Sequence, residues 1–144
     1  MVAVWTMEEA VSALKRQGAK ITSQRLAILR LLQGRRDHPS AECVYQELKG
    51  EFPTISFATI YSTTQLLAQA ELIQILTVDN KRVHFDPNPE PHAHYHCIHC
   101  GRIYDIPLSE RTVGEILQHT DFQVGQIQIY LYGTCPECLK GLTQ

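Results

Sequence analysis

Two cysteine pairs are the most specific chemical feature of the sequence. Each pair has the spacing Cys-x-x-Cys, and the four residues are Cys97, Cys100, Cys135 and Cys138. Two intervening residues allow both thiolates of a pair to reach one ion at about 2.3 Å, the Zn–S distance of structural zinc sites. The doubled spacing therefore predicts a tetrahedral zinc site with a structural role. A redox-active dithiol in each pair is the alternative, and the repetition of the spacing favours the metal.

Histidines and carboxylates predict a second metal site of different chemistry. His92 and His94 share one face of an extended segment, because side chains alternate along a strand. The candidate ligands are His38, Asp86, His92, His94 and Asp105. Three imidazoles and two carboxylates without a thiolate suit Fe(II) or Mn(II), and they tolerate Zn(II). The remaining histidines are expected to be surface or satisfied core residues: His84, His96, His99 and His119.

The first 86 residues have the pattern of a winged helix-turn-helix. Apolar residues recur at helical spacing in four segments, residues 7–17, 23–34, 41–50 and 57–70. The period then changes to 2 on both sides of Asp79-Asn80, which predicts a β-hairpin over residues 72–85. In a winged helix, the last helix before the hairpin lies in the major groove of DNA.

The predicted recognition helix carries short polar side chains that can contact base edges or phosphates. They are Ser56, Thr59, Tyr61, Ser62, Thr63 and Gln65. Upstream, residues 10–36 contain seven Lys and Arg residues and no acidic residue. A helix that is merely polar on its solvent side, and a solvated basic face, are the alternatives.

A proline-rich connector separates this part from a second, smaller one. Residues 87–91 contain three prolines, which favours an extended, semi-rigid hinge. Beyond it the pattern predicts a strand over residues 102–106, a helix over 109–119 and a strand over 122–132. The predicted fold class is therefore α+β, with a winged-helix domain over residues 1–86 and a small α/β domain over 92–144. A unit of roughly 55 residues buries little surface and needs metal staples or a partner chain.

Composition narrows the class of protein further. The net charge of −2 is the sum of two unlike parts, with ten basic and nine acidic residues up to Asp86 and three basic and six acidic residues after it. No apolar run approaches the roughly 18 residues of a membrane helix, and the opening residues lack a basic leader, so we expect a cytoplasmic protein without a membrane partner. A metalloenzyme is the alternative from another class, but no second nucleophile–base set is evident. We expect neither an enzyme nor a small-molecule substrate.

Several motifs together resemble the ferric uptake regulator (Fur) family of metal-dependent repressors over nearly the whole chain. They are Lys20-Ile-Thr-Ser-Gln-Arg25, His38-Pro-Ser-Ala41, Ile55-Ser-Phe-Ala-Thr-Ile-Tyr61, His92-Ala-His94 before Cys97, and Tyr132-Gly-Thr-Cys135-Pro-Glu-Cys138. The resemblance implies a homodimer that binds palindromic operator DNA through the winged-helix domains. It further implies that the second domain is a dimerisation domain, and that a regulatory metal between the domains holds the DNA-binding shape.

Two aspartates indicate which branch of the family the chain resembles. Iron-uptake sensors usually have glutamates at the positions of Asp86 and Asp105, whereas peroxide-sensing, PerR-like members have aspartates at both. The PerR-like interpretation implies that Fe(II) with peroxide oxidises His38 or His92 and releases the DNA, while Mn(II) gives a repressor that peroxide does not affect. An iron or manganese uptake regulator without peroxide sensing is the alternative.

The resemblance also marks residues for DNA contact. Family precedent carries Lys20 over as a minor-groove contact and Tyr61 as a base or backbone contact. Ser62 matches neither branch, since iron sensors typically have Arg there and peroxide sensors Asn. The predicted DNA contacts are Lys20, Arg25, Thr59, Tyr61 and Ser62.

Overall fold

The computed structural model of the chain describes residues 5–142. These residues form two compact units, which divide after Pro89. Residues 1–4, on which the expectation of no leader partly rests, lie outside the described residues. Within residues 5–142, no helix is long and apolar enough to cross a membrane.

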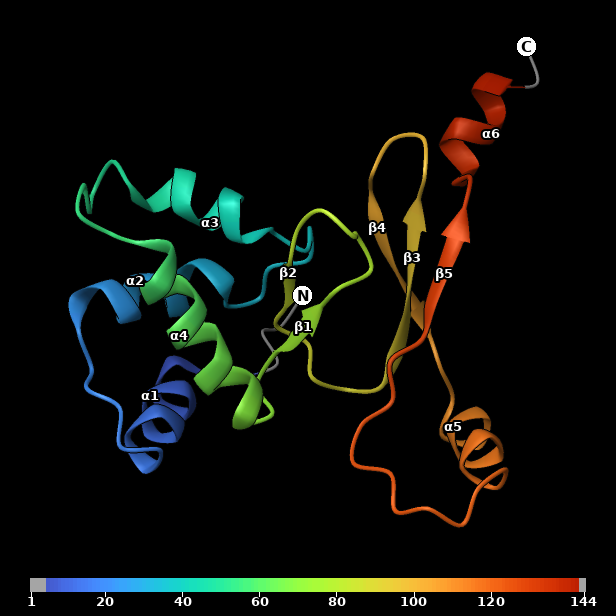
Figure 1. Cartoon of the computed structure of the whole chain (residues 1–144), viewed down its shortest axis with the longest axis horizontal. Helices are drawn as coiled ribbons and strands as arrows, with labels where there is room; N and C mark the ends of the chain where they lie inside the picture. The colour runs from blue at the N-terminus through green and yellow to red at the C-terminus, as the bar shows by residue number, and fades with distance from the viewer. Residues whose placement is uncertain (1–4, 143–144) are drawn as a thin grey trace. The chain divides into compact units, whose positions relative to one another are not determined.

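The first unit is a winged helix-turn-helix, as the sequence predicts (Figure 1). Its elements are α1 (Met7–Arg16), α2 (Ser23–Leu32), α3 (Ala41–Leu48), α4 (Phe57–Gln69), β1 (Gln74–Leu76) and β2 (His84–Asp86). The strands β1 and β2 pair antiparallel and form the wing. Fully buried side chains from all four helices and the wing make one core that includes Leu14, Ile28, Val44, Ile60, Leu67 and Phe85.

Capping side chains set where the four helices begin. The cap residues Thr6, Thr22, Ser40 and Ser56 each accept a hydrogen bond from the backbone N–H three residues further on. Each such bond satisfies an N–H that the helix itself leaves without a carbonyl partner, and it stabilises a helix by about 1 kcal/mol. The helix starts are therefore fixed locally, by residue type.

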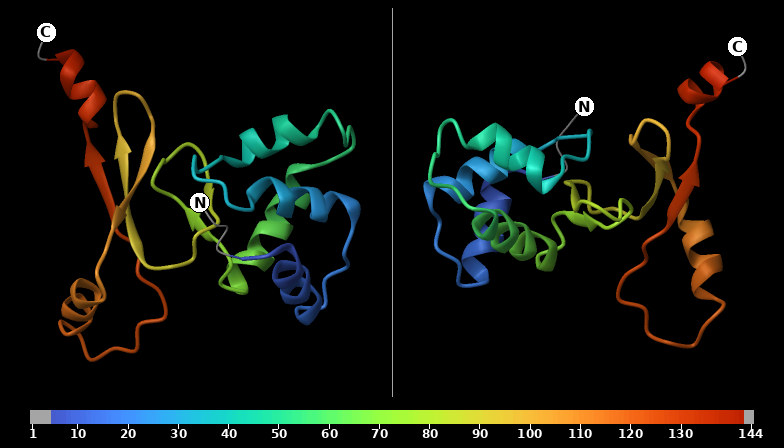
Figure 2. Two further views of the ribbon diagram at one scale, coloured as in Figure 1. Left: turned by 180° about the vertical axis from the view of Figure 1, so that it is seen from behind. Right: turned by 45° about the horizontal axis from the view of Figure 1, so that its top comes forward.

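The second unit is a three-stranded sheet with two short helices (Figure 2). Its elements are β3 (His92–Cys97), β4 (Ile103–Pro107), α5 (Glu110–Leu117), β5 (Tyr130–Gly133) and α6 (Pro136–Leu142). The strand order is β4-β3-β5, in which β3 pairs antiparallel with β4 and parallel with β5. The helix α6 has no counterpart in the sequence prediction.

The predicted strand over residues 122–132 was wrong in length, because only Tyr130–Gly133 forms a strand. The register pairs Tyr130 with His94, so residues before 128 would have to pair with the proline-rich residues 87–91. Prolines have no backbone N–H to donate to a neighbouring strand. The ladder therefore ends near His94, and residues 121–126 are exposed.

Candidate metal centres and nucleic-acid interface

The four cysteines of the second unit come together as predicted from their spacing. Cys97 ends β3 and Cys100 lies in the turn that follows it, while Cys135 directly precedes α6 and Cys138 lies in its first turn. The Sγ atoms are 3.7 Å apart for Cys97 and Cys138 and 3.8 Å apart for Cys100 and Cys135, and all four lie within 4.8 Å of one another. Four sulfurs bound tetrahedrally at 2.3 Å would lie about 3.8 Å apart. The geometry fits one zinc ion and no disulfide.

The surroundings of the cysteines favour a bound cation. Backbone N–H groups, first of all that of Cys100, lower the pKa of Cys97 to about 5, so this sulfur is a thiolate at neutral pH. A hydrogen bond from the Tyr104 hydroxyl lowers the pKa of Cys135 as well. In contrast, the hydrogen bond with Cys135, together with burial, raises the pKa of Cys138 to about 12. The sulfurs therefore do not all ionise without a cation, and a divalent ion supplies the missing charge.

The first unit holds one part of the predicted regulatory set. His38 and Asp86 are buried, and His38 Nε2 lies 3.4 Å from Asp86 Oδ2. The other oxygen, Asp86 Oδ1, accepts a hydrogen bond of 2.9 Å from the Asn88 backbone N–H, which orients the carboxylate. The first unit thus presents one imidazole and one carboxylate side by side.

The second unit holds the other part of the set. Nε2 atoms of His92 and His94 lie 3.1 and 3.5 Å from Asp105 Oδ1, because β3 and β4 pair His94 with Asp105. His92 Nδ1 is 2.6 Å from the Glu90 carbonyl oxygen. Because this oxygen accepts a hydrogen bond, Nδ1 carries the hydrogen of the neutral ring, and the lone pair is on Nε2. Two lone-pair atoms at 3.1 Å need a cation between them, either a proton or a metal ion. This half is suited to metal binding.

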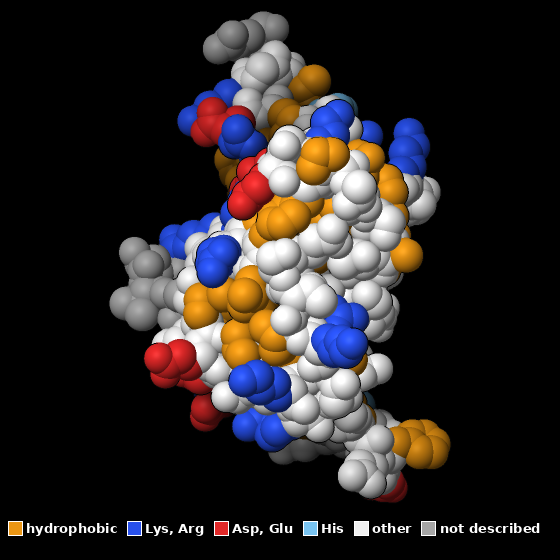
Figure 3. All heavy atoms as spheres, turned by 90° about the vertical axis from the view of Figure 1, so that its left-hand side faces the viewer, with side chains coloured by type: hydrophobic (Ala, Val, Ile, Leu, Met, Phe, Trp, Pro, Cys, Tyr) orange, Lys and Arg blue, Asp and Glu red, His pale blue; other side chains and the backbone are white. Residues whose placement is uncertain are grey.

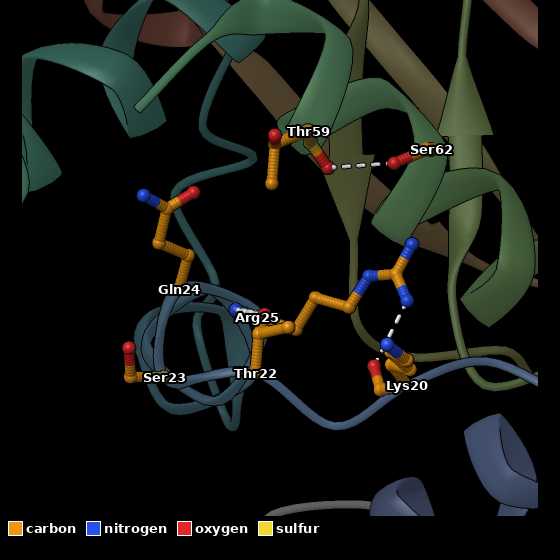
Figure 4. A pocket seen from close by; sticks show the side chains of 7 residues that line it. All are labelled: Lys20, Thr22, Ser23, Gln24, Arg25, Thr59 and Ser62. Carbon is orange, nitrogen blue, oxygen red and sulfur yellow. Dashed lines mark hydrogen bonds between the residues drawn. The ribbon is translucent and has the colours of Figure 1, made fainter. Parts of the chain in front are cut away.

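Most predicted DNA contacts line one pocket of about 480 Å³ where α2 and α4 begin (Figure 4). Its lining residues are Lys20, Thr22, Ser23, Gln24, Arg25, Thr59 and Ser62. The lining has two cations and no carboxylate, so it suits an anion such as a DNA phosphate. Arg25 is held in place by a 2.9 Å hydrogen bond to the Lys20 carbonyl, and the Ser62 hydroxyl donates to the Thr59 carbonyl at 3.1 Å.

Tyr61 lies outside this pocket and is 39% exposed. Its ring centroid is 6.3 Å from that of Phe57, which in turn stacks on Tyr45 at 4.6 Å. An aromatic side chain braced in this way presents a fixed apolar edge beside the pocket. On the face of the molecule at the left of Figure 1, Lys and Arg side chains are spread among uncharged ones, with Asp and Glu side chains mainly toward one edge of the view (Figure 3).

Two residues near the candidate sites escaped the sequence analysis. The Tyr104 hydroxyl donates a hydrogen bond directly to Cys135, and no local motif marks this tyrosine. His84, expected to be an ordinary surface or core residue, contacts both the His38 backbone and Asp79. The predicted hairpin places Asp79 in its turn and His84 in the strand that follows. This proximity is the one sequence signal that could have indicated their contact.

Comparison with known proteins identifies the family and agrees with the fold. The model of the ferric uptake regulator family matches residues 16–132. The peroxide-responsive repressor PerR of Staphylococcus aureus is 37% identical over 134 residues, covering 92% of this chain and 90% of the relative.

Two solved structures extend the comparison. The Campylobacter jejuni peroxide stress regulator is 31% identical with a TM-score of 0.66, covering 89% of this chain and 98% of the other. The ferric uptake regulator of Vibrio cholerae is 30% identical with a TM-score of 0.67, covering 86% and 98%. The chain belongs to the ferric uptake regulator family of metal-responsive regulators.

Proposed function

We propose that this family member is a homodimeric, metal-dependent repressor that binds operator DNA and loses that affinity when peroxide oxidises it. The observation that carries the proposal is the donor set. Each unit presents imidazole beside aspartate, with His38 at 3.4 Å from Asp86 in one and His92 at 3.1 Å from Asp105 in the other. In the proposal the five residues His38, Asp86, His92, His94 and Asp105 bind one ion together, and the four cysteines hold a separate structural zinc.

The chemistry of these donors favours Fe(II) or Mn(II) as the regulatory ion. Oxygen and imidazole ligands suit both ions, and the set contains no thiolate that would select copper. Fe(II) bound there would supply the redox chemistry that activates peroxide. The chain's own contribution is to hold His38 and His92 where one ring is oxidised by two electrons: it takes up one oxygen atom of peroxide, and the other oxygen leaves as water.

Peroxide sensing is favoured over iron or manganese uptake regulation by two observations. Both carboxylate ligands, at positions 86 and 105, are aspartates, and aspartates at these two positions are what the resemblance associates with the peroxide-sensing branch. PerR of Staphylococcus aureus is 37% identical. The uptake regulator stays the second candidate, since the Vibrio cholerae ferric uptake regulator has nearly the same TM-score as the Campylobacter jejuni peroxide regulator.

Dimerisation is supported by the apolar surface of the second unit. The helix α5 has no buried residue, although apolar side chains occur on it at helical spacing. Exposed large apolar side chains of this unit include Ile116, Leu117, Phe122, Val124 and Leu131. Exposed apolar patches of this kind mark interaction surfaces. A second copy of the chain would cover them and would bring two α4 helices to half-sites about 34 Å apart.

Metal dependence follows as a population shift. An ion bound by residues of both units favours one orientation of the winged-helix domain, and a palindromic operator binds only that orientation well. Lys20, Arg25, Thr59, Tyr61 and Ser62 supply the contacts to DNA in the proposal. Oxidation of His38 or His92 removes a ligand and restores the other orientations.

A gel-shift titration with Mn(II) on a palindromic operator tests the proposal. The wild-type protein should bind DNA more tightly as Mn(II) is added, and His92→Ala should abolish this response. His119→Ala, which replaces an exposed histidine on another element, is the matched control and should respond like the wild type. DNA binding by wild-type protein that is indifferent to Mn(II) would refute metal dependence.

A further inference from the structure

The side chain of His84 lies against the backbone of a predicted metal ligand. Its Nδ1 is 2.8 Å from the His38 carbonyl oxygen. A carbonyl oxygen only accepts hydrogen bonds, so His84 Nδ1 carries the hydrogen and donates it. We infer that His84 is a positioning residue, which holds the His38 backbone in the conformation that directs the His38 imidazole toward Asp86. The inference rests on the proposed function only where it takes His38 as a metal ligand.

His38 needs support because of its backbone conformation. Its φ is +52°, in the left-handed region that residues other than glycine seldom adopt. Such a conformation persists only when surrounding contacts over-determine it. The backbone at this residue sets the direction of the imidazole, whose Nε2 lies 3.4 Å from Asp86 Oδ2.

The wing supplies contacts to the residues that follow His38. The Phe85 N–H donates to the Pro39 carbonyl at 2.9 Å, and the Ala41 N–H donates to the Val83 carbonyl at 3.1 Å. Ser40 and His84 form an isolated antiparallel bridge. These main-chain contacts hold residues 39–41, directly beside the His38 carbonyl, so we expect them to open more readily when the contact at that carbonyl is lost. The contact at the His38 carbonyl, in contrast, comes from a side chain and therefore depends on the identity of residue 84.

The other end of the His84 ring faces the Asp79 carboxylate. Its Nε2 lies 3.3 Å from Asp79 Oδ2, and Asp79 Oδ1 accepts a 3.0 Å hydrogen bond from the Lys81 N–H. The side chains of His84 and Asp79 are only 14% and 17% exposed, so water competes weakly for these contacts. A continuous path of contacts therefore runs from the turn of the wing through Asp79 and His84 to His38.

Two substitutions separate this role from a general loss of stability. His84→Leu removes both polar contacts, whereas His84→Asn keeps an amide N–H close to the place of Nδ1 and gives up the contact with Asp79. His119→Leu is the control for the change of residue type at an exposed position. All variants are prepared as full-length, zinc-loaded protein.

The first readout is amide hydrogen exchange of Ala41 and Phe85 without any regulatory metal. We expect exchange at both amides to be roughly tenfold faster in His84→Leu, and close to wild type in His84→Asn and His119→Leu. This readout does not depend on the proposed function. Unchanged exchange in His84→Leu would overturn the inference, as would equal acceleration in His84→Asn.

The second readout is the dissociation constant for Mn(II). Loss of a residue that orients a ligand typically weakens metal binding by about 10- to 100-fold, and we expect His84→Leu in that range and His84→Asn within a few-fold of wild type. DNA affinity at saturating Mn(II) should be near wild type in both. If His92→Ala leaves Mn(II) affinity unchanged, the proposed metal site fails, and hydrogen exchange still decides the role of His84. If His92→Ala binds Mn(II) weakly but His84→Leu binds it as tightly as the wild type, the positioning role of His84 is contradicted.

Discussion

At the scale of single residues, Arg35 joins the loop after α2 to α3 through two carboxylates. Its Nε lies 2.7 Å from Asp37 Oδ1, and its Nη2 lies 2.9 Å from Glu47 Oε2. The hydrogen bond from Arg35 is the main cause that lowers the pKa of Asp37, and likewise that of Glu47. Both carboxylates therefore stabilise the folded state as long as they are ionised.

The pH dependence of stability tests this contact. Carboxyl groups with a lowered pKa in the folded state stabilise it above their ordinary pKa of about 4, and the contribution is lost as the pH falls through the folded-state values. Since both carboxylates are largely exposed, we expect Arg35→Met to lower the free energy of unfolding by about 1 kcal/mol at pH 7. The difference from wild type should shrink below pH 4. Urea unfolding at pH 7 and below pH 4 measures the free energy of unfolding, with Arg36→Met at an exposed neighbouring position as the control. A loss of stability in Arg35→Met that is equal at the two pH values would contradict the electrostatic origin.

Residue type and spacing predicted the cysteine site because its chemistry is local. Each Cys-x-x-Cys pair forms one turn, and sequence separation alone limits the geometry. The contacts of Arg35 with Glu47, and of His84 with the His38 carbonyl, join positions 12 and 46 residues apart. Such contacts depend on how the elements pack, so the sequence predicted neither.

At the scale of elements, Gly133 is needed where β5 lies beside β3. The register pairs Gly133 with Cys97, and a Cβ atom at Gly133 would collide with the Tyr95 hydroxyl. No local sequence pattern predicts this close approach, because it depends on the parallel pairing of two strands far apart in the chain.

A pair of substitutions tests the close approach. Gly133→Ala should lower stability by about 1 to 3 kcal/mol, the usual cost of an overpacked site. Tyr95→Phe in the same chain should recover part of the loss, because it removes the nearest atom while the ring Cζ stays at 3.3 Å. Gly125→Ala, where a Cβ has nothing within 4 Å, is the control. Thermal unfolding of the zinc-loaded proteins measures the effect, and full stability of Gly133→Ala would show that the strands separate easily.

The pocket where α2 and α4 begin predicts a phosphate contact by Arg25. Loss of one phosphate contact reduces the slope of log affinity against log salt by about 0.9. We expect this reduction for Arg25→Gln in the Mn(II)-loaded protein, with equal weakening for different operator sequences. Arg111→Gln makes the same change of charge in the second unit, at an arginine 86% exposed, and should leave the slope unchanged. A change in sequence preference with Arg25→Gln would instead indicate that Arg25 contacts a base.

Elements with strong local signals were predicted well. The helices α1 to α4 begin within a residue of their predicted starts, because the caps and apolar spacing act locally. The predicted strand over 122–132 failed for the opposite reason. Its alternating Ile127, Ile129 and Leu131 fit a strand, but a strand also needs a partner with free N–H groups, and the prolines of residues 87–91 do not provide it.

At the scale of the whole molecule, the near-neutral charge hides two different parts. The unit that carries the winged helix also carries most of the basic residues, and the unit that carries the cysteine site is acidic. The second unit buries few large side chains, so the proposed zinc site and partner chain would offset its small core. The family is established by the family model and the relatives, and in our proposal the stimulus acts at His38 and His92.

Peptide mass analysis after peroxide exposure tests the central claim most directly. The protein is loaded with Fe(II) without oxygen, treated with hydrogen peroxide and digested, and a Mn(II)-loaded sample is treated in parallel. If the protein senses peroxide, a peptide containing His38 or His92 gains the mass of one oxygen atom in the Fe(II) sample alone, and operator binding is lost. If the peptide masses of the Fe(II)-loaded protein stay unchanged while its DNA binding still requires metal, peroxide sensing is contradicted. That result would identify an uptake regulator.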